Sequence, residues 1–152
     1  MHKPLIEIER WDMRFLELAD TIRKWSKDPS RKIGAIAVRD RKILATGYNG
    51  FPKGIEDTHE RYNNREIKYR YVVHAEMNCI YNAAANGISL KDSTLYIHGL
   101  PVCSDCALGI IQAGVSRVVA ISGSTPDRWK EAIDKTNEIF KEAGVIYEFT
   151  EV

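Results

Sequence analysis

The sequence predicts a single layered α/β domain, and two observations support this prediction. Segments with helical apolar spacing alternate with short apolar runs, which gives the order helix–strand–strand–helix–strand–helix–strand–helix–strand. The length of 152 residues suits one domain with a sizeable core. We therefore expect residues 1–152 to form one domain, with no internal repeat and no low-complexity segment.

The first half of the chain is expected to supply one helix and a pair of strands. Apolar side chains recur at helical spacing over about residues 12–26, and Asp28-Pro29 ends that helix. These side chains are Phe15, Leu18, Ala19, Ile22 and Trp25. Apolar runs at 33–38 and 43–48 flank four polar residues and predict two strands. Residues 49–73 are expected to be a long polar connection, either functional or an ordinary solvated excursion.

The second half alternates strands and helices. Residues 74–86 and 103–113 predict helices that end at Gly87 and Gly114. Residues 94–97 and 118–121 predict strands.

Thr125 and Pro126 have the character of an N-cap followed by proline at the first position of the last helix. One face of that helix should carry Trp129, Ala132, Ile133, Thr136, Phe140 and Ala143. Gly144 ends it, and residues 145–149 predict the last strand.

Composition excludes several classes of protein. Hydrophobic residues make up 44% and charged residues 28% of the chain, as in ordinary soluble domains. A net charge of +1 gives no strong electrostatic case for a nucleic-acid partner. No apolar run approaches the length of a membrane span, and residues 1–10 do not resemble a signal peptide. Three cysteines, two of them in C-x-x-C, favour a reducing compartment, so we expect a cytoplasmic protein.

The central chemical feature is one histidine and two cysteines, His74, Cys103 and Cys106. Together these ligands suit zinc. No fourth ligand is evident at a matching spacing, and a catalytic zinc site leaves that position to water. Glu76 is an acid–base candidate beside such a site. The alternatives are a thioredoxin-like C-x-x-C pair, or a core histidine with two inert thiols.

Both parts of this motif open a predicted helix. The positive partial charge at a helix N-terminus favours thiolate at Cys103 and Cys106. Residues two apart do not share one side of a helix. His74 and Glu76 can therefore serve one centre only if that centre lies beyond the helix end.

H-x-E followed by C-x-x-C resembles the motif of the zinc nucleobase deaminases, and several further stretches are similar to deoxycytidylate (dCMP) deaminases. These stretches are 26–30 (SKDPS), 33–35 (IGA), 47–52 (GYNGFP), 73–78 (VHAEMN) and 106–114 (CALGIIQAG). The resemblance covers about residues 13–149. It departs from the family pattern directly before the first cysteine, where Val102 replaces the usual proline and Pro101 stands one place earlier.

The resemblance implies a fold and an activity. The fold is a cytidine-deaminase-like α/β/α sandwich around a five-stranded mixed sheet, and the cofactor is Zn²⁺. The activity is hydrolytic deamination of dCMP to dUMP and ammonia. Alternatives are deamination of another nucleoside, of a free base or of tRNA adenosine, or a non-catalytic zinc module. The resemblance further implies a homo-oligomer, hexamer or dimer, with dCTP and dTTP as possible effectors acting near residues 47–50.

The resemblance also implies roles for single residues. Glu76 is expected to take a proton from water and to return protons to the cytosine N3 and to the leaving amine. Ala75 and Asn49 are expected to contact the substrate, Asn49 through the sugar, although Asn49-Gly50 is also a turn signal. Ile33 resembles a pocket-lining residue, with plain strand core as the alternative.

A nucleotide phosphate requires charged donors. Five basic residues near the matched stretches are candidates, each with an ordinary surface charge as the alternative: Lys27, Arg31, Lys32, Lys53 and Arg70. Cys79 lies about 140° around its helix from His74 and is expected in the core. Trp11, Trp25 and Trp129 are expected to pack and not to stack on a base.

Overall fold

The computed structural model describes residues 9–152 and contains a five-stranded sheet with six α-helices and one 3₁₀ turn. Along the chain the elements are α1 (Arg10–Arg23), β1 (Gly34–Arg39), β2 (Lys42–Tyr48), α2 (His59–Asn63), α3 (Arg65–Tyr71), α4 (Ala75–Ala85), β3 (Thr94–His98), α5 (Ser104–Gln112), β4 (Arg117–Ser122), η2 (Asp127–Trp129), α6 (Lys130–Ala143) and β5 (Ile146–Glu151). Within the described range, no helix is both long and apolar enough to cross a bilayer.

The sheet is mixed, as expected, with the strand order β2-β1-β3-β4-β5. β1 is antiparallel to both β2 and β3, whereas β3, β4 and β5 are parallel. The β1–β2 hairpin turns at Asp40 and Arg41, whose φ angles of 53° and 62° fit a two-residue turn that follows the sheet twist. The parallel strands are joined through α5 and α6, because parallel neighbours need a crossover connection.

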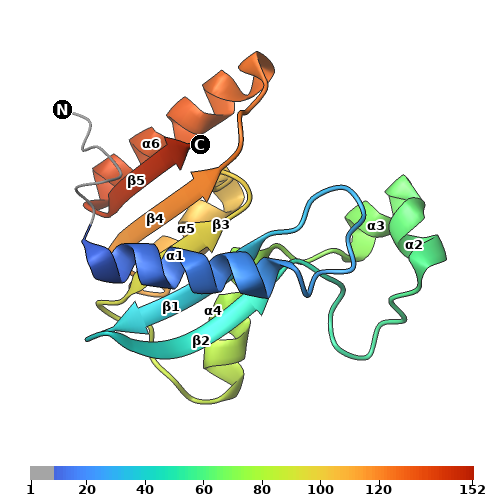
Figure 1. Ribbon diagram of the computed structural model, residues 1–152, viewed down its shortest axis with the longest axis horizontal. Helices are drawn as coiled ribbons and strands as arrows, with labels where there is room; N and C mark the ends of the chain where they lie inside the picture. The colour runs from blue at the N-terminus through green and yellow to red at the C-terminus, as the bar shows by residue number, and fades with distance from the viewer. Residues whose placement is uncertain (1–8) are drawn as a thin grey trace.

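Helices cover both faces of the sheet (Figure 1), which confirms the three-layer α/β/α prediction. α1 packs on one face, and α4, α5 and α6 contribute to the core on the other. β1 shows why both faces are apolar: Ala35 and Ala37 belong to the α4 side, while Ile36 and Val38 belong to the α1 side. Alternate strand residues point to opposite faces, so a fully apolar strand lies between two helical layers.

The first helix buries Phe15, Ala19 and Ile22 as predicted, but it differs from the prediction in its extent and at Leu18. α1 ends at Arg23, and its buried apolar face uses Leu16, with Leu18 41% exposed. Trp25 follows the helix and is 60% exposed, in edge contact with Tyr48. The expectation that Leu18 and Trp25 belong to a packed face is therefore wrong. The helix α1 ends before Trp25, and the Leu18 side chain lies on the solvent side of α1.

The long polar connection predicted between β2 and α4 contains two short helices, α2 and α3. Each begins at a polar cap: the Thr58 side chain accepts the Arg61 amide, and the Asn64 side chain accepts the Ile67 amide. These caps stabilise helices that lack a buried apolar stripe. In Figure 1 both helices project from the side of the sheet.

The last helix also begins later than predicted. Thr125 does not cap it: its hydroxyl donates to Glu151, and Pro126 precedes the 3₁₀ turn η2. α6 itself begins at Lys130, so Trp129 lies outside it. Its predicted face is buried only at Thr136 and Phe140, while Ala132 and Ala143 are exposed.

Candidate active site

Chain segments that are distant in sequence meet at one edge of the sheet. The end of β3 pairs with the start of β1, and the start of β1 pairs with the end of β2. Ile33 precedes β1, Asn49 follows β2, and the segment before α5 follows β3. Loops beyond the carboxyl ends of parallel strands are the usual ligand site of an α/β sheet, and here they supply the candidate site.

His74, Cys103 and Cys106 come together at this edge. His74 is the N-cap residue of α4 and Cys103 that of α5. Their ligand atoms all lie within 4.8 Å of one another. His74 Nδ1 lies 3.2 Å from Cys106 Sγ and 3.6 Å from Cys103 Sγ. The centre lies beyond the two helix ends, where the spacing of His74 and Glu76 required it to be.

The three donors fit zinc. Two thiolates and one imidazole are the set that binds this metal at tetrahedral sites. Across residues 9–152 no other group of three metal-ligating side chains converges, and neither His59 nor His98 joins this one. His2 lies outside the described residues. A three-ligand set leaves one position for water or substrate, as catalytic sites do.

The thiol groups of Cys103 and Cys106 have pKa values shifted in opposite directions. A hydrogen bond with Cys106 lowers the pKa of Cys103 to about 4, and the same bond raises the pKa of Cys106 above its usual range. The hydrogen bond with Cys103 raises the pKa of His74. Metal ligation requires deprotonated thiols, so binding of a divalent cation at this cluster would release protons.

Glu76 lies beside this cluster in the first turn of α4. It is only 5% exposed, and its burial raises the pKa of its carboxyl. It lines the same pocket as His74 and Cys103. A buried carboxyl with a raised pKa is suited to both accepting and returning a proton near neutral pH.

A glycine brings α4 close enough to the sheet to place these groups. A Cβ on Gly47 would lie 2.4 Å from the Cys79 amide nitrogen and 2.6 Å from the Ala75 carbonyl oxygen, so only glycine fits between β2 and α4. Asn78 also ties the two elements by donating to the Tyr48 carbonyl at 2.8 Å. Cys79 is fully buried, as predicted.

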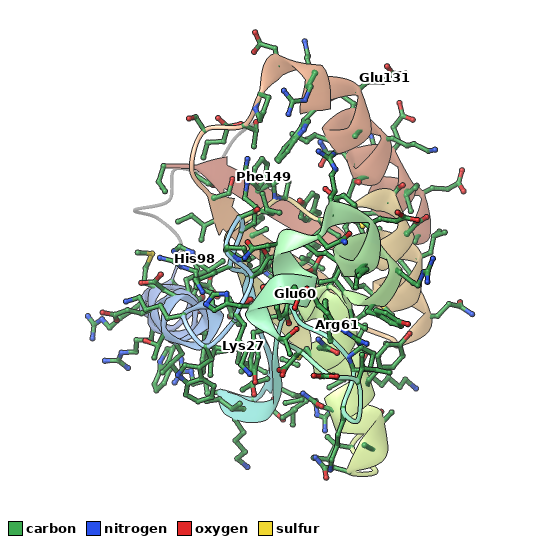
Figure 2. The ribbon with its side chains drawn as sticks, turned by 90° about the vertical axis from the view of Figure 1, so that its right-hand side faces the viewer. Lys27, Glu60, Arg61, His98, Glu131 and Phe149 are labelled. Atoms are coloured by element: carbon green, nitrogen blue, oxygen red, sulfur yellow. The ribbon has the colours of Figure 1, made fainter. Side chains whose placement is uncertain are left out.

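A pocket of about 350 Å³ opens in front of Glu76. Four predicted site residues outside the metal and proton groups line it: Arg31, Ile33, Asn49 and Ala75. Four basic candidates do not line it: Lys27, Lys32, Lys53 and Arg70. Figure 2 views the molecule from the side of α2 and α3 and shows Lys27 near α1; its Nζ pairs with Asp57 at 3.0 Å. Lys32 Nζ donates to the Ser26 carbonyl.

The pocket wall includes residues that the sequence did not single out. Lys68 of α3 pairs with Asp28 at 2.8 Å, with side chains 13% and 4% exposed. Trp129 also lines the pocket, and the Arg31 guanidinium lies 5.1 Å from its ring centre. Trp129 therefore packs, as predicted, but it does so at the pocket. The only feature of the sequence that pointed to Lys68 was its place in the long polar connection at residues 49–73, which could be functional.

The Asn49 side chain holds one wall of the pocket together. Its oxygen accepts the Ile33 amide at 2.9 Å, and its nitrogen donates to the Arg31 carbonyl at 2.8 Å and to Asp28 at 3.3 Å. Both amide hydrogens are thereby used within the chain. Asn49 is 4% exposed, and its oxygen retains one free lone pair.

Comparisons with known proteins agree with this geometry. A family model described as the cytidine and deoxycytidylate deaminase zinc-binding region matches residues 9–122. The deoxycytidylate deaminase of Mus musculus is 36% identical over 143 residues, which cover 90% of this chain and 78% of the mouse protein. An uncharacterised deaminase from the luxG 3′ region of Aliivibrio fischeri is 37% identical over 141 residues, covering 91% of this chain and 92% of that protein.

A solved structure shares the fold over nearly the whole chain. The dCMP deaminase of cyanophage S-TIM5, crystallised with dCMP and dUMP, has a TM-score of 0.72 and 27% identity. The match covers 99% of this chain and 100% of the phage chain. Together with the zinc-binding triad, these findings show that the chain belongs to the cytidine and deoxycytidylate deaminase family.

Proposed function

We propose that this protein is a hydrolytic deaminase that converts dCMP to dUMP and ammonia. The observation that carries the proposal is a buried Glu76 beside the His74, Cys103 and Cys106 cluster, facing a pocket of nucleotide size. Relatives named deoxycytidylate deaminases and the phage enzyme bound to dCMP and dUMP support the choice of substrate.

The chemistry divides between the metal and the chain. The two thiolates of Cys103 and Cys106 and the imidazole of His74 would hold a zinc ion, which would supply Lewis-acid activation of water. Glu76 accepts a proton as water attacks C4 of cytosine. Its carboxyl passes that proton to N3. It then takes the second proton from the new C4 hydroxyl and delivers it to the amine as the C4–N bond breaks, so that ammonia departs and the C4 carbonyl of uracil remains. Its burial excludes bulk water, which would otherwise compete for these protons.

The pocket offers a place for each part of the nucleotide. Ala75 and Ile33 form the apolar wall next to Glu76 and would meet the base. The free lone pair of the Asn49 oxygen can accept from a sugar hydroxyl. Arg31 and Lys68 supply the positive charge at the pocket, and a guanidinium with an ammonium suits a phosphate. We therefore propose Arg31 from the predicted candidates, and Lys68 in addition, as phosphate contacts.

The alternatives find less support. A non-catalytic zinc module would close its metal with a fourth protein ligand, and the described residues provide none at this cluster. The net charge of +1 does not favour tRNA as a substrate. Homo-oligomerisation, control by dCTP and dTTP, and a cytoplasmic location stay predictions. The three free cysteines agree with a reducing compartment.

The proposal is tested by measuring ammonia release from dCMP, deoxycytidine, cytidine, cytosine and a tRNA. We expect kcat/KM for dCMP to exceed that for deoxycytidine at least about a hundredfold, because two charge-assisted phosphate contacts contribute about 1.5–3 kcal/mol each. Equal values for the two substrates would move the assignment to a nucleoside deaminase. A zinc-loaded protein that releases no ammonia from any substrate would overturn the deaminase proposal.

A further inference from the structure

The peptide groups on either side of Val102 are held by two hydroxyls from the C-terminal part of the chain. The Val102 amide donates to the Tyr147 hydroxyl oxygen at 3.2 Å. The Thr136 hydroxyl donates to the Val102 carbonyl at 3.0 Å. Tyr147 lies on β5 and Thr136 on α6, so both contacts reach back to the loop after β3 over more than thirty residues.

This loop delivers a metal ligand. The carbonyl of Val102 belongs to the peptide bond with Cys103, so a hydrogen bond to that oxygen fixes the plane from which the Cys103 side chain begins. The amide of Val102 belongs to the preceding peptide, and its bond to Tyr147 fixes that plane as well. Pro101 has no N–H and offers no bond of its own. The two hydroxyls thus hold both peptides before the ligand.

The contacts are buried, which makes them costly to lose. Val102 is 2% and Thr136 is 1% exposed. A buried amide or carbonyl without a partner costs about 1–3 kcal/mol, because no water reaches it. The P-C-x-x-C signature of zinc deaminases has proline directly before the first cysteine, where this chain has Val102, and proline has no amide hydrogen to satisfy. The valine introduces a buried donor, and the Tyr147 hydroxyl accepts from it.

We propose that Tyr147 and Thr136 are positioning residues that orient Cys103 for zinc through the Val102 peptides. The inference rests on the metal site of the proposed deaminase, but it is tested on metal retention, which does not depend on the substrate. Groups that orient metal ligands without binding the metal themselves typically change metal affinity by about 10–100-fold when removed. Tyr147 and Thr136 contact the backbone next to Cys103 and not its sulfur, so we expect a change in metal affinity at the lower end of this range.

The test replaces each hydroxyl without changing its shape, in Tyr147→Phe and Thr136→Val. Zinc transfer from the holoprotein to the chromophoric chelator 4-(2-pyridylazo)resorcinol should accelerate at least about tenfold in each variant. The cobalt-substituted protein should also show a weakened thiolate-to-cobalt charge-transfer band, because one sulfur is misplaced. KM for dCMP should change less than about twofold, since neither hydroxyl lines the pocket.

Tyr62→Phe is the matched control. The Tyr62 hydroxyl accepts the Phe51 amide at 3.1 Å, which is the same bond between a tyrosine and a backbone amide, and Tyr62 is buried. Phe51 precedes no metal ligand. This variant should therefore lose a similar amount of unfolding free energy while its zinc transfer rate and cobalt spectrum stay at the wild-type values.

Val102→Pro supplies a rescue, because it deletes the amide hydrogen that Tyr147 satisfies. In the double variant Val102→Pro/Tyr147→Phe, zinc retention and the cobalt spectrum should return toward wild type. Wild-type zinc retention in Tyr147→Phe and Thr136→Val would overturn the proposal. Equal acceleration in Tyr62→Phe would also overturn it, because general loosening would then explain the effect. Thr136→Val keeps the test decisive if Tyr147→Phe does not fold.

Discussion

The side-chain oxygen of Asn49 accepts the Ile33 amide at 2.9 Å, and this bond joins the end of β2 to the residue before β1 beneath the pocket. The same side chain donates to Arg31 and Asp28. Asn49 therefore builds the wall that carries Arg31 and Ile33, in addition to facing the substrate space itself.

Replacing Asn49 with alanine should lower stability as well as activity. Three buried hydrogen bonds disappear, so the free energy of unfolding in urea should fall by about 2–4 kcal/mol. A variant that keeps wild-type stability while losing kcat/KM for dCMP would contradict this expectation. It would assign Asn49 to substrate contact alone.

The convergence of His74, Cys103 and Cys106 could be predicted from sequence, because residue type and spacing mark them as one set of ligands. Because His74 and Cys103 stand at the starts of two helices, the three side chains lie together. Lys68 could not be predicted, because its partner Asp28 is forty residues away and no local pattern links them. The strand order follows from contacts across the whole chain, whereas the alternation of strands and helices is local.

Other differences arise where two local signals compete. Leu16 and Leu18 both suit a helical stripe, and packing against β1 and β3 selects Leu16. Trp129 has the apolar character of a core residue, but it ends the 3₁₀ turn η2 and lines the pocket. Tertiary contacts decide both cases, and these contacts are invisible in a single sequence.

Gly47→Ala should damage the site from a distance. The added Cβ would meet backbone atoms of α4, which cannot rotate away as a side chain can. α4 must shift, and His74 and Glu76 shift with it. We expect a loss of about 2–4 kcal/mol in unfolding free energy together with reduced zinc content by elemental analysis. The control is Gly123→Ala, whose Cβ would meet nothing within 4 Å.

Glu76→Gln should separate proton transfer from metal binding. The amide keeps the size of the side chain but cannot carry the proton, so kcat for dCMP should fall at least about a hundredfold. Zinc content and the circular dichroism spectrum should stay at wild-type values, because Glu76 is not one of the ligands. A variant that retains more than about a tenth of wild-type kcat would remove Glu76 from the mechanism.

His98 should make stability depend on pH. Its Nδ1 is buried without a hydrogen-bond partner among the described residues, and burial lowers its pKa, although the Asp20 carboxylate opposes this shift. The unfolded chain therefore binds this proton at a higher pH than the folded chain does. The unfolding free energy should fall as pH drops through the ordinary histidine value of 6.5 and level off below the folded pKa.

His98→Gln should remove that part of the pH dependence. Between about pH 7.5 and 5.5, the unfolding free energy should fall less in this variant than in the wild type. His59→Gln is the control, because His59 is exposed on α2 and its replacement should leave the slope unchanged. An identical slope in His98→Gln and wild type would show that His98 titrates alike in both states.

Arg31 should contribute to phosphate recognition, whereas the basic residues away from the pocket should not. Alanine at Arg31 should raise KM for dCMP at least about tenfold, because a charge-assisted hydrogen bond is worth about 1.5–3 kcal/mol. Turnover of deoxycytidine, which has no phosphate, should stay nearly unchanged. Alanine at Lys27, Lys32, Lys53 or Arg70 should change neither the KM for dCMP nor the turnover of deoxycytidine by more than about twofold.

Lys68 needs a different substitution, because Lys68→Ala would leave the buried Asp28 carboxylate unpaired, at a cost of about 3–5 kcal/mol in stability. The double variant Asp28→Asn/Lys68→Met removes both charges and avoids that penalty. Its KM for dCMP should rise at least about tenfold relative to Asp28→Asn/Lys68→Arg, which retains the positive charge. Both double variants should process deoxycytidine alike. If the KM for deoxycytidine rises in parallel, Lys68 shapes the pocket and does not contact a phosphate.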